Sequence, residues 1–257
     1  VKRSEKIGRI SASNTTLEVE NPDNYRDGTL VRMLNISRLP LVQFSGKLEY
    51  LLRYPFGCLE QVTSSAFPLI YLADIAKETN PEIFEKADPA SLVQAAIGRI
   101  SSLQAAGGGF SLWPGGGSVE PWASIYAAHF LVDARRAGYF IEDPVYSGAI
   151  RFLKNEARAR KEYSTGELQR TVYALYALGR DGQPETSVMD LIRDRHLSEL
   201  TVESRALLGG SYAAAGDASA IEELLKGIQD VEQVERQTGG NFNSTIRNRA
   251  ILLLAIL

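Results

Sequence analysis

The stretch WASIYAAHFLVDA, residues 122–134, carries the strongest signal about architecture, because three other segments share its character. Each of the four pairs a polar opening with a face rich in Ala and Leu. The other three are RTVYALYALG (170–179), SRALLGGSYAAAG (204–216) and RNRAILLLAIL (247–257). Their irregular spacing of roughly 35 to 50 residues predicts stacked helical hairpins, either an open solenoid or a closed α/α ring.

The helical pattern extends over most of the chain. From Leu48 onward apolar residues recur at intervals of three and four, which predicts about ten helices of roughly ten to eighteen residues and no strand. Breaks rich in Gly, Pro and polar residues separate these helices. They are TNPE, EKADP, GGGFSLWPGGG, IEDP, RDGQPE, AAGD and TGGN.

The first 45 residues differ from the rest. Two β-prone pieces, TTLEVE and TLVRMLNIS, flank the turn-rich NPDNYRDG. This pattern predicts a strand pair or the end of a β-domain in residues 1–45, followed by a helical domain in residues 46–257. The chain ends in the apolar run AILLLAIL without a polar cap, so we expect the helical domain to continue beyond it. That run is too short to span a bilayer.

Composition excludes several classes of protein. The formal net charge is −3, and Lys and Arg are interspersed with acidic residues, so no long basic field predicts binding to nucleic acid or to an anionic membrane. The single cysteine gives no disulfide framework. No cluster of Cys, His and acidic residues has metal-ligand spacing, so neither a metal nor another cofactor is expected.

That cysteine stands in YPFGCLEQVTSS, residues 54–65. Residues three apart lie on one helix face with Cβ atoms about 5–6 Å apart, so Cys58 and Gln61 can meet. Gly57 would ease this approach, because a Cβ there would obstruct the backbone. A thiolate held against the Gln61 carboxamide can expel ammonia and form an internal thioester, since fixed geometry supplies effective molarities of about 10⁵ M or more.

A thioester is an acylating agent, so it is useful only when water is excluded. Tyr54, Pro55 and Phe56 before the motif, and Phe67 and Pro68 after it, are residue types that could shield it. For any one of the aromatic residues, ordinary core packing is the favoured interpretation, and a lone cysteine is usually a small buried hydrophobic residue.

The segment GCLEQ, preceded by YLLRYPF and followed by a predicted helix, resembles the thioester motif of the α2-macroglobulin and complement family in its bacterial form. Animal members usually carry Gly in the place of Leu59. The segment GGGFSLWPGGGSVEPWASIYAAHFL (107–131) resembles the glycine-rich turn and Trp-led helix of that family. TLVRMLNIS is similar to the strand by which a CUB-type domain enters the thioester domain.

The resemblance implies an α/α toroid within a large multidomain protease trap. Cys58 would supply the thioester sulfur and Gln61 the acyl group, with Gly57, Leu59 and Glu60 completing the motif; the role of Glu60 stays open. Cleavage of a bait region elsewhere would uncover the thioester, and a lysine amine of the protease would attack the Gln61 carbonyl. Such a domain acts once per molecule and is therefore not an enzyme.

The resemblance also implies a location and partners. Bacterial members are exported, commonly tethered to the periplasmic side of the inner membrane, and can act in defence beside a peptidoglycan transglycosylase. The expected partners are target proteases and neighbouring domains of the same chain, without nucleic acid.

One departure from the family concerns histidine. Complement-type members that acylate hydroxyls use a histidine from a later hairpin, but the comparable stretch here, KEYSTGELQRTVYA (161–174), contains none. We expect His129 to be packed in the core and His196 to be solvated among charged residues. Without an imidazole relay, amines should outcompete water and sugar hydroxyls.

Two alternatives from other classes remain. The first is a toroid enzyme that processes carbohydrates or polyprenyl groups with paired carboxylates, with Trp113 or Trp122 stacking on a sugar, or a Cys58/His129 thiol hydrolase. No spacing singles out an acid–base pair, and most of the candidate acids lie where surface loops or helix caps would place them. These acids are Glu120, Asp133, Glu142, Asp143 and Glu167.

The second alternative is a helical-repeat module that binds a partner non-covalently. The turn GGGFSLWPGGGS also invites a phosphate-loop interpretation, but it lacks the GK[ST] ending and a preceding strand. We expect its glycines to let the chain reverse, with Trp113 packed on the rim.

Overall fold

The computed structural model describes residues 57–79, 84–85, 88–158 and 160–227, together with residues 250 and 253. In these residues the chain is mainly α-helical, as predicted, and extended pairing is limited to isolated β-bridges in the loop before α5. The predicted β segment, residues 1–45, lies outside the described residues. The helices are α2 (Leu59–Thr79), α4 (Pro89–Ser101), α5 (Pro121–Arg136), α6 (Asp143–Glu156), α7 (Thr165–Arg180), α8 (Thr186–His196), α9 (Val202–Ala214) and α10 (Ser219–Leu225), with a 3-10 turn η2 (Leu197–Glu199).

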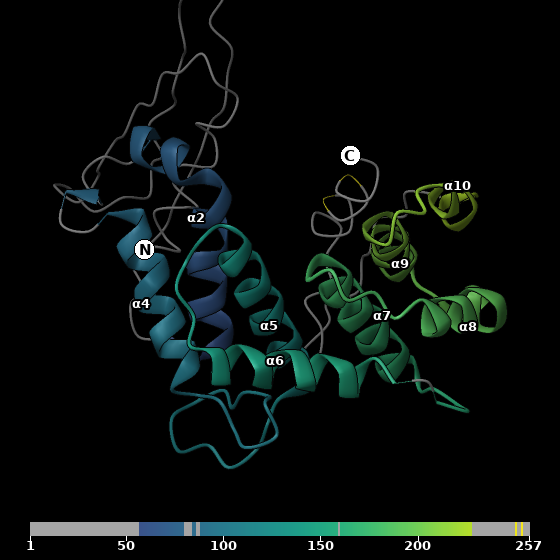
Figure 1. The fold of residues 1–257 in the computed structure, drawn as a ribbon, viewed down its shortest axis with the longest axis horizontal. Coiled ribbons are helices and arrows are strands. Elements are labelled where there is room, and N and C mark those ends of the chain that lie inside the picture. Colours follow the sequence, from purple (N-terminus) through teal and green to yellow (C-terminus); the bar gives the residue numbers. More distant parts are fainter. Residues whose placement is uncertain are drawn as a thin grey trace, which may run out of the picture.

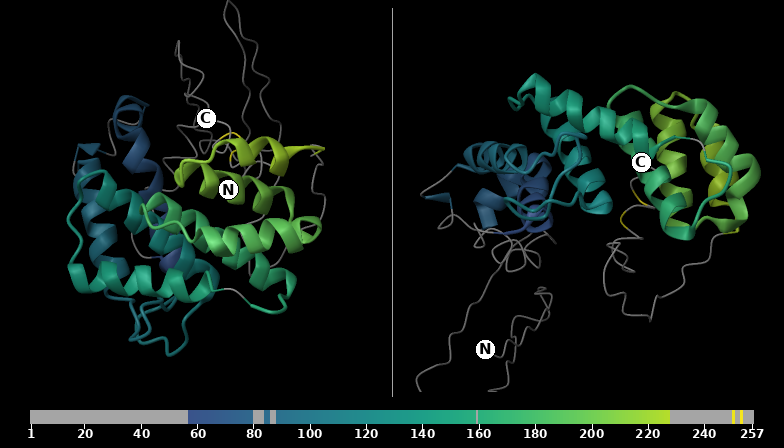
Figure 2. Two further views of the ribbon diagram at one scale, coloured as in Figure 1. Left: turned by 45° about the vertical axis from the view of Figure 1, so that its right-hand side comes forward. Right: turned by 90° about the horizontal axis from the view of Figure 1, so that it is seen from below.

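The helices form two layers of consecutive hairpins, as expected for an α/α toroid. Helices α2, α5, α7 and α9 pack side by side in that order as the inner layer. Helices α4, α6, α8 and α10 flank them as the outer layer, each against one or two inner helices. In Figure 1 the chain progresses from the blue helices on one side to the green and yellow helices on the other, and Figure 2 shows the same series from two further sides.

The inner helices α2, α5 and α7 run parallel to one another. Between α2 and α5, Ser64 contacts Tyr126 and, further along both helices, Tyr71 contacts Asp133. Between α5 and α7, contacts likewise advance together, from His129 with Tyr173 to Asp133 with Arg180. The N-terminal ends of these helices therefore lie at one rim of the array, and their C-terminal ends lie at the opposite rim.

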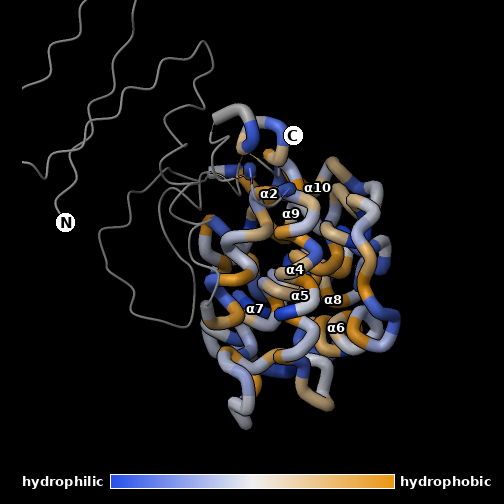
Figure 3. The backbone as a smooth tube through the Cα atoms, turned by 90° about the vertical axis from the view of Figure 1, so that its left-hand side faces the viewer, coloured by the Kyte–Doolittle hydropathy of each residue, from blue (hydrophilic) through white to orange (hydrophobic). Residues whose placement is uncertain are grey.

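Burial distinguishes the two layers. More than half of the residues of α5 and of α7 are buried, whereas only Met189 and Ile192 are buried in α8. Three of the four recurring Ala- and Leu-rich segments lie in the inner helices α5, α7 and α9, where small residues let helices pack closely on two sides. Figure 3 shows the hydrophobic stretches alternating with hydrophilic ones along the tube.

Local sequence explains where the helices begin. Pro89 and Pro121 occupy first-turn positions, where the missing N–H has no intrahelical partner to lose. Asp88, Ser164 and Thr201 accept hydrogen bonds from backbone N–H groups at the starts of α4, α7 and α9.

Helix α2 is longer than the predicted range, with 21 residues, and it is kinked. Pro68 lies inside it, where a proline removes one backbone hydrogen bond and crowds the preceding turn. Leu72, one turn later, departs from helical geometry at φ −120° and ψ 20°. The kink separates the N-terminal turns of α2 from its last turns.

Candidate functional site

Cys58 and Gln61 meet at the start of α2. Cys58 immediately precedes the helix, and its carbonyl accepts the first intrahelical hydrogen bond, from Val62 at 3.0 Å. The Cys58 backbone N–H donates to Oε1 of Gln61 at 3.1 Å. This is half of a capping box, in which a Glu or Gln at the third helical position reaches back to the residue before the helix.

The capping geometry explains how the Gln61 carboxamide comes to lie against the backbone of Cys58. In a complete box the residue before the helix is Ser or Thr, and its side chain and the returning Glu or Gln side chain both fold over the first turn. Here Cys58 occupies the Ser or Thr position. Cys58 is partly buried and Gln61 is exposed, so the pair lies at the surface of the inner-helix rim.

Gly57 is required by the same close approach of the Gln61 side chain to the start of the helix. A Cβ at this position would lie 2.4 Å from Cβ and 2.8 Å from Oε1 of Gln61. Any other residue would therefore push the Gln61 side chain away from Cys58. A Cβ at residue 57 was expected to obstruct the backbone, and the structure shows that it would collide with the Gln61 side chain.

The glycine-rich turn lies against this motif. Leu59 is fully buried, and its N–H donates to the carbonyl of Leu112 at 2.9 Å. The turn reverses as predicted, with Gly108 at a φ of +87°, where a Cβ would clash with the carbonyl of Gly148. Trp113 does not pack on the rim as expected, because it is 54% exposed. Sequence analysis missed the role of Leu112, which has no chemically distinctive side chain.

Glu60 is the acidic member of the motif and is partly buried. Burial, and then the negative charge of Glu120 at the start of α5, raise the pKa of Glu60 above its ordinary value. Glu120 itself accepts a hydrogen bond from the Ala123 N–H at 2.6 Å. The motif therefore faces the N-terminus of the neighbouring inner helix.

The predicted shielding residues divide into two groups. Tyr54, Pro55 and Phe56 lie outside the described residues. Phe67 lies nine residues after Cys58, which is about 13 Å along a helix that rises about 1.5 Å per residue. Its ring packs in the core against Tyr126 and His129, at centroid distances of 5.6 and 4.9 Å. Phe67 therefore does not cover the thiol.

His129 is a packed histidine, as predicted. Its side chain is 13% exposed, with Nδ1 3.1 Å from the Tyr173 hydroxyl and Nε2 3.2 Å from Oδ2 of Asp133. Because its ring lies at the level of Phe67, it is separated from Cys58 by more than two helical turns. The geometry contradicts a Cys58/His129 catalytic pair.

Asp133 ties three inner helices together, a role that the sequence did not reveal. It is 4% exposed and accepts from the Tyr71 hydroxyl of α2 at 2.5 Å and from the Arg180 guanidinium of α7 at 2.9 and 3.1 Å. Burial alone would raise the pKa of Asp133, but His129, Tyr71 and Arg180 together hold it well below the ordinary value. We call Tyr71, His129, Asp133 and Arg180 the interhelical tie.

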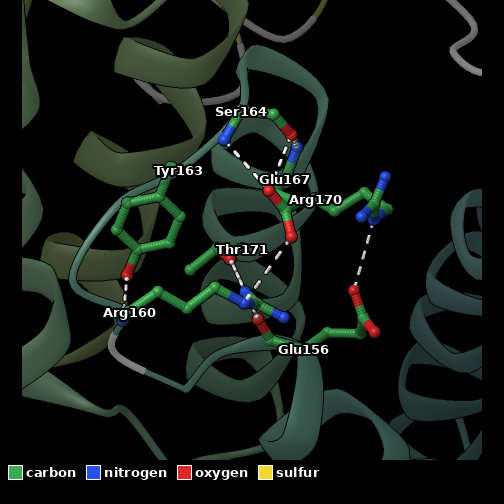
Figure 4. A network of polar contacts seen from close by, with 7 residues as sticks. All are labelled: Glu156, Arg160, Tyr163, Ser164, Glu167, Arg170 and Thr171. Atoms are coloured by element: carbon green, nitrogen blue, oxygen red, sulfur yellow. Dashed lines mark hydrogen bonds and ion pairs between the residues drawn. The ribbon is translucent and has the colours of Figure 1, made fainter.

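The stretch at residues 161–174 uses its polar side chains for structure. Ser164 and Glu167 form a complete capping box at the start of α7, and the hydrogen bonds from Ser164 lower the pKa of Glu167. Arg160 donates to Thr171 at 2.9 Å, and Arg170 pairs with Glu156 of α6 at 3.3 Å. Figure 4 shows these groups pointing toward one another.

The expectation for His196 was wrong. Its side chain is only 15% exposed, because it packs edge-on against the Tyr163 ring and pairs with Glu199 at 2.8 Å. The contact with Tyr163 joins residues distant in sequence, so the local run of charges did not reveal it.

The acids weighed for a hydrolytic site do not converge. Glu120 and Glu167 cap helices, and Glu142 and Asp143 lie at the start of α6. Asp133 is buried in the interhelical tie, contrary to a surface position. Trp122 is 5% exposed and cannot present a face to a sugar.

In the described part of the chain, no group of three or more His, Cys, Asp or Glu residues could hold a metal ion. None of the helices in that part is both long enough and apolar enough to cross a bilayer.

Sequence comparison finds relatives among bacterial proteins. The chain is 26% identical over 233 residues to an α2-macroglobulin of Xylella fastidiosa strain Temecula1, which covers 87% of this chain and 14% of the relative. It is 27% identical over 247 residues to the Escherichia coli K12 α2-macroglobulin, which covers 90% of this chain and 15% of the relative. The chain thus spans about one seventh of the length of these relatives. No family model matches it.

Solved structures show the same fold. A native E. coli α2-macroglobulin structure, which runs from domain MG7 to the C-terminus, superposes with a TM-score of 0.72 at 23% identity, over 85% of this chain and 35% of that chain. The structure of Salmonella α2-macroglobulin reacted with methylamine gives a TM-score of 0.68 at 27% identity, over 81% of this chain and 14% of that chain. A trypsin-activated E. coli α2-macroglobulin structure gives a TM-score of 0.65 at 23% identity, over 79% of this chain and 14% of that chain. By sequence and by fold, this chain is a homologue of the bacterial α2-macroglobulins that matches a segment of their C-terminal part.

Proposed function

We propose that this chain is the thioester domain of a protease-trapping inhibitor and that Cys58 and Gln61 form its reactive bond. In forming it, the Cys58 sulfur attacks Cδ of Gln61, the bond from Cδ to Nε2 breaks, and ammonia leaves with the thiol proton. The observation that carries the proposal is the capping contact of 3.1 Å between the Cys58 N–H and the Gln61 side-chain oxygen. This contact holds the Gln61 carboxamide against the backbone of the residue that carries the thiol.

The second step is acyl transfer to an amine. The neutral lysine amine of an attacking protease adds to Cδ of Gln61, the bond from carbon to sulfur breaks, the sulfur leaves as a thiolate, and the amine nitrogen gives up one proton to water. The N-terminus of α2 favours this departure, because the unpaired N–H groups of a first helical turn stabilise negative charge. The protease is then joined to Gln61 by an amide bond, and the site is spent.

Amines are the preferred nucleophiles in this proposal. His129 is buried in the interhelical tie, and His196 packs against Tyr163, so neither is available beside Gln61 as an acyl relay. A nucleophile must therefore react directly, which favours a strongly nucleophilic amine over water or a hydroxyl. The structure of the Salmonella relative reacted with methylamine is in line with amine reactivity in such proteins.

The whole protein is proposed to act where its bacterial relatives would meet foreign proteases, on the periplasmic side of the inner membrane. Trypsin activation of an E. coli relative supports proteases as targets. The neighbouring domains of the trap, including the bait region, are expected in other parts of a longer protein. Tyr54 and Phe56 are proposed to shield the bond until the bait is cut.

The test is methylamine incorporation followed by thiol titration. Methylamine should add once, at Gln61, and one thiol should appear at Cys58. Cys58→Ala and Gln61→Glu should abolish both changes, whereas the control Gln94→Glu, on an exposed helix position, should retain them. Incorporation that persists in Cys58→Ala would contradict the proposal. Repeated turnover of an added substrate, abolished by changing an acid, would instead favour the enzyme alternative.

A further inference from the structure

A hollow of about 420 Å³ lies along the outer helix α6, away from the motif at the start of α2. Tyr146 and Ile150, which are largely buried, contribute to its lining. Its other lining residues are all polar or charged, and none of them is acidic. The proposed acylation chemistry does not use this hollow.

Three cations border the hollow. Arg151 and Lys154 lie on one face of α6, where residues three apart are about 5–6 Å from each other, and Arg158 follows the helix end. Among the described residues none of the three forms an ion pair, whereas Arg135 and Arg170, on the neighbouring inner helices, pair with acids of α6. Like charges at this spacing destabilise a helix. The dipole of α6 favours a cation in the last turn of the helix, such as Lys154. Its effect is weak at Arg151, which lies before that turn.

Neutral donors adjoin these cations. Ser147 and Asn155 are exposed at the edge of the hollow. The acid that touches its lining is Asp181, which accepts hydrogen bonds from the Tyr146 hydroxyl and, at 2.6 Å, from the Gln183 amide. Both oxygens of Asp181 are thus engaged by neutral groups. The three positive charges are left facing the hollow without a carboxylate among the described residues.

We propose that this hollow binds a multiply charged phosphate group. Arginine guanidinium groups match phosphate oxygens with paired N–H donors, and a lysine adds a mobile point charge. The overall net charge is −3, so the attraction is a local property of α6 and not of the whole surface. The phosphate can belong to a soluble ligand or to a lipid headgroup, and both offer the same oxygens to Arg151, Lys154 and Arg158.

The experiment is titration of the protein with inorganic pyrophosphate at low ionic strength. Binding is monitored by calorimetry and by the NMR chemical shifts of the arginine side chains. We expect saturable binding at one site, weakened at least tenfold in the double variant Arg151→Gln/Arg158→Gln. The matched control is Arg99→Gln/Arg195→Gln, which removes the same charge from exposed positions of α4 and α8 and should bind like the unmodified protein.

A second arm identifies the source of the phosphate. Co-sedimentation is measured with phosphatidylglycerol vesicles and, for comparison, with phosphatidylcholine vesicles. Preferential co-sedimentation with phosphatidylglycerol that depends on the same two arginines assigns the site to a lipid headgroup. Pyrophosphate binding without such co-sedimentation assigns it to a soluble ligand. Absence of saturable binding in both arms, or equal weakening by the two double variants, overturns the proposal. Because Cys58 takes no part, methylamine incorporation is unchanged in every one of these outcomes.

Discussion

The two ends of the inner helices carry polar clusters of opposite design. At the N-terminal rim, Cys58 is partly buried, Gln61 is exposed, and a neutral hydrogen bond joins them. At the other end, the interhelical tie buries Asp133 and surrounds it with donors from three helices. The difference fits the proposal that the first cluster reacts, whereas the second holds α2, α5 and α7 together.

The largest effect is expected from breaking the interhelical tie. Asp133→Ala leaves the Arg180 guanidinium without its buried partner, and removing one member of a buried ion pair costs about 3–5 kcal/mol. Urea unfolding should show this loss. Asp143→Ala, which removes the exposed partner of Arg135, is the control and should change the free energy of unfolding little. Similar losses in both variants would refute the role of the tie.

The reactive end is tested by Gly57→Ala. The added Cβ would lie 2.4 Å from the Gln61 Cβ, so the first turn must shift and carry the carboxamide with it, and a misplacement of about 1 Å can cost about a hundredfold in rate. Methylamine incorporation should fall by about this factor, whereas the helical content should be retained. Gly107→Ala, with no neighbour within 4 Å of the new Cβ, is the control. Normal incorporation in Gly57→Ala would show that the fold-back of Gln61 is unnecessary.

The pH dependence of stability sharpens the comparison. The folded state lowers the pKa of Asp133, so its contribution is fully present above its unfolded pKa of about 3.9 and is lost as pH falls through the folded value. The difference in unfolding free energy between the unmodified protein and Asp133→Asn should therefore shrink as the pH falls below about 3.9. A difference that grows as the pH falls below about 3.9 would contradict this assignment.

The smallest effect is expected at the start of α7. Ser164→Ala removes the hydroxyl of a capping box, which typically costs about 1 kcal/mol of stability. Since Ser164 belongs to a different inner helix from Cys58, methylamine incorporation should be unchanged. Ser102→Ala, at the C-terminal end of α4, controls for loss of an exposed serine hydroxyl. A marked drop in incorporation would mean that the stretch at 161–174 takes part in acylation.

Much of the fold could be predicted because it depends on local pattern. The Ala- and Leu-rich segments at 122–134, 170–179 and 204–216 proved to be three inner helices, since helices that pack on two sides need small and apolar residues over most of their surface. The breaks rich in Gly and Pro fall between the helices. The layer to which each helix belongs depends on tertiary contacts and could not be predicted from periodicity.

The candidate site was predictable for a similar reason. Gly57, Cys58 and Gln61 lie within one helical turn, and a Gln three residues after the position preceding a helix is itself a capping signal. The interhelical tie could not be predicted from the sequence, because Asp133 meets Arg180 and Tyr71 only after α2, α5 and α7 are packed. The same limit applies to His196, whose burial depends on the distant Tyr163.

The most direct test of the central claim is the intact mass of the untreated protein. An intact bond between Cys58 and Gln61 predicts a mass lower than that of the sequence by one ammonia. A bond that formed and was later hydrolysed predicts a Glu in place of Gln61, which peptide mapping detects. A mass that matches the sequence, with Gln61 unchanged in every peptide, would contradict the proposal that these two residues form a thioester.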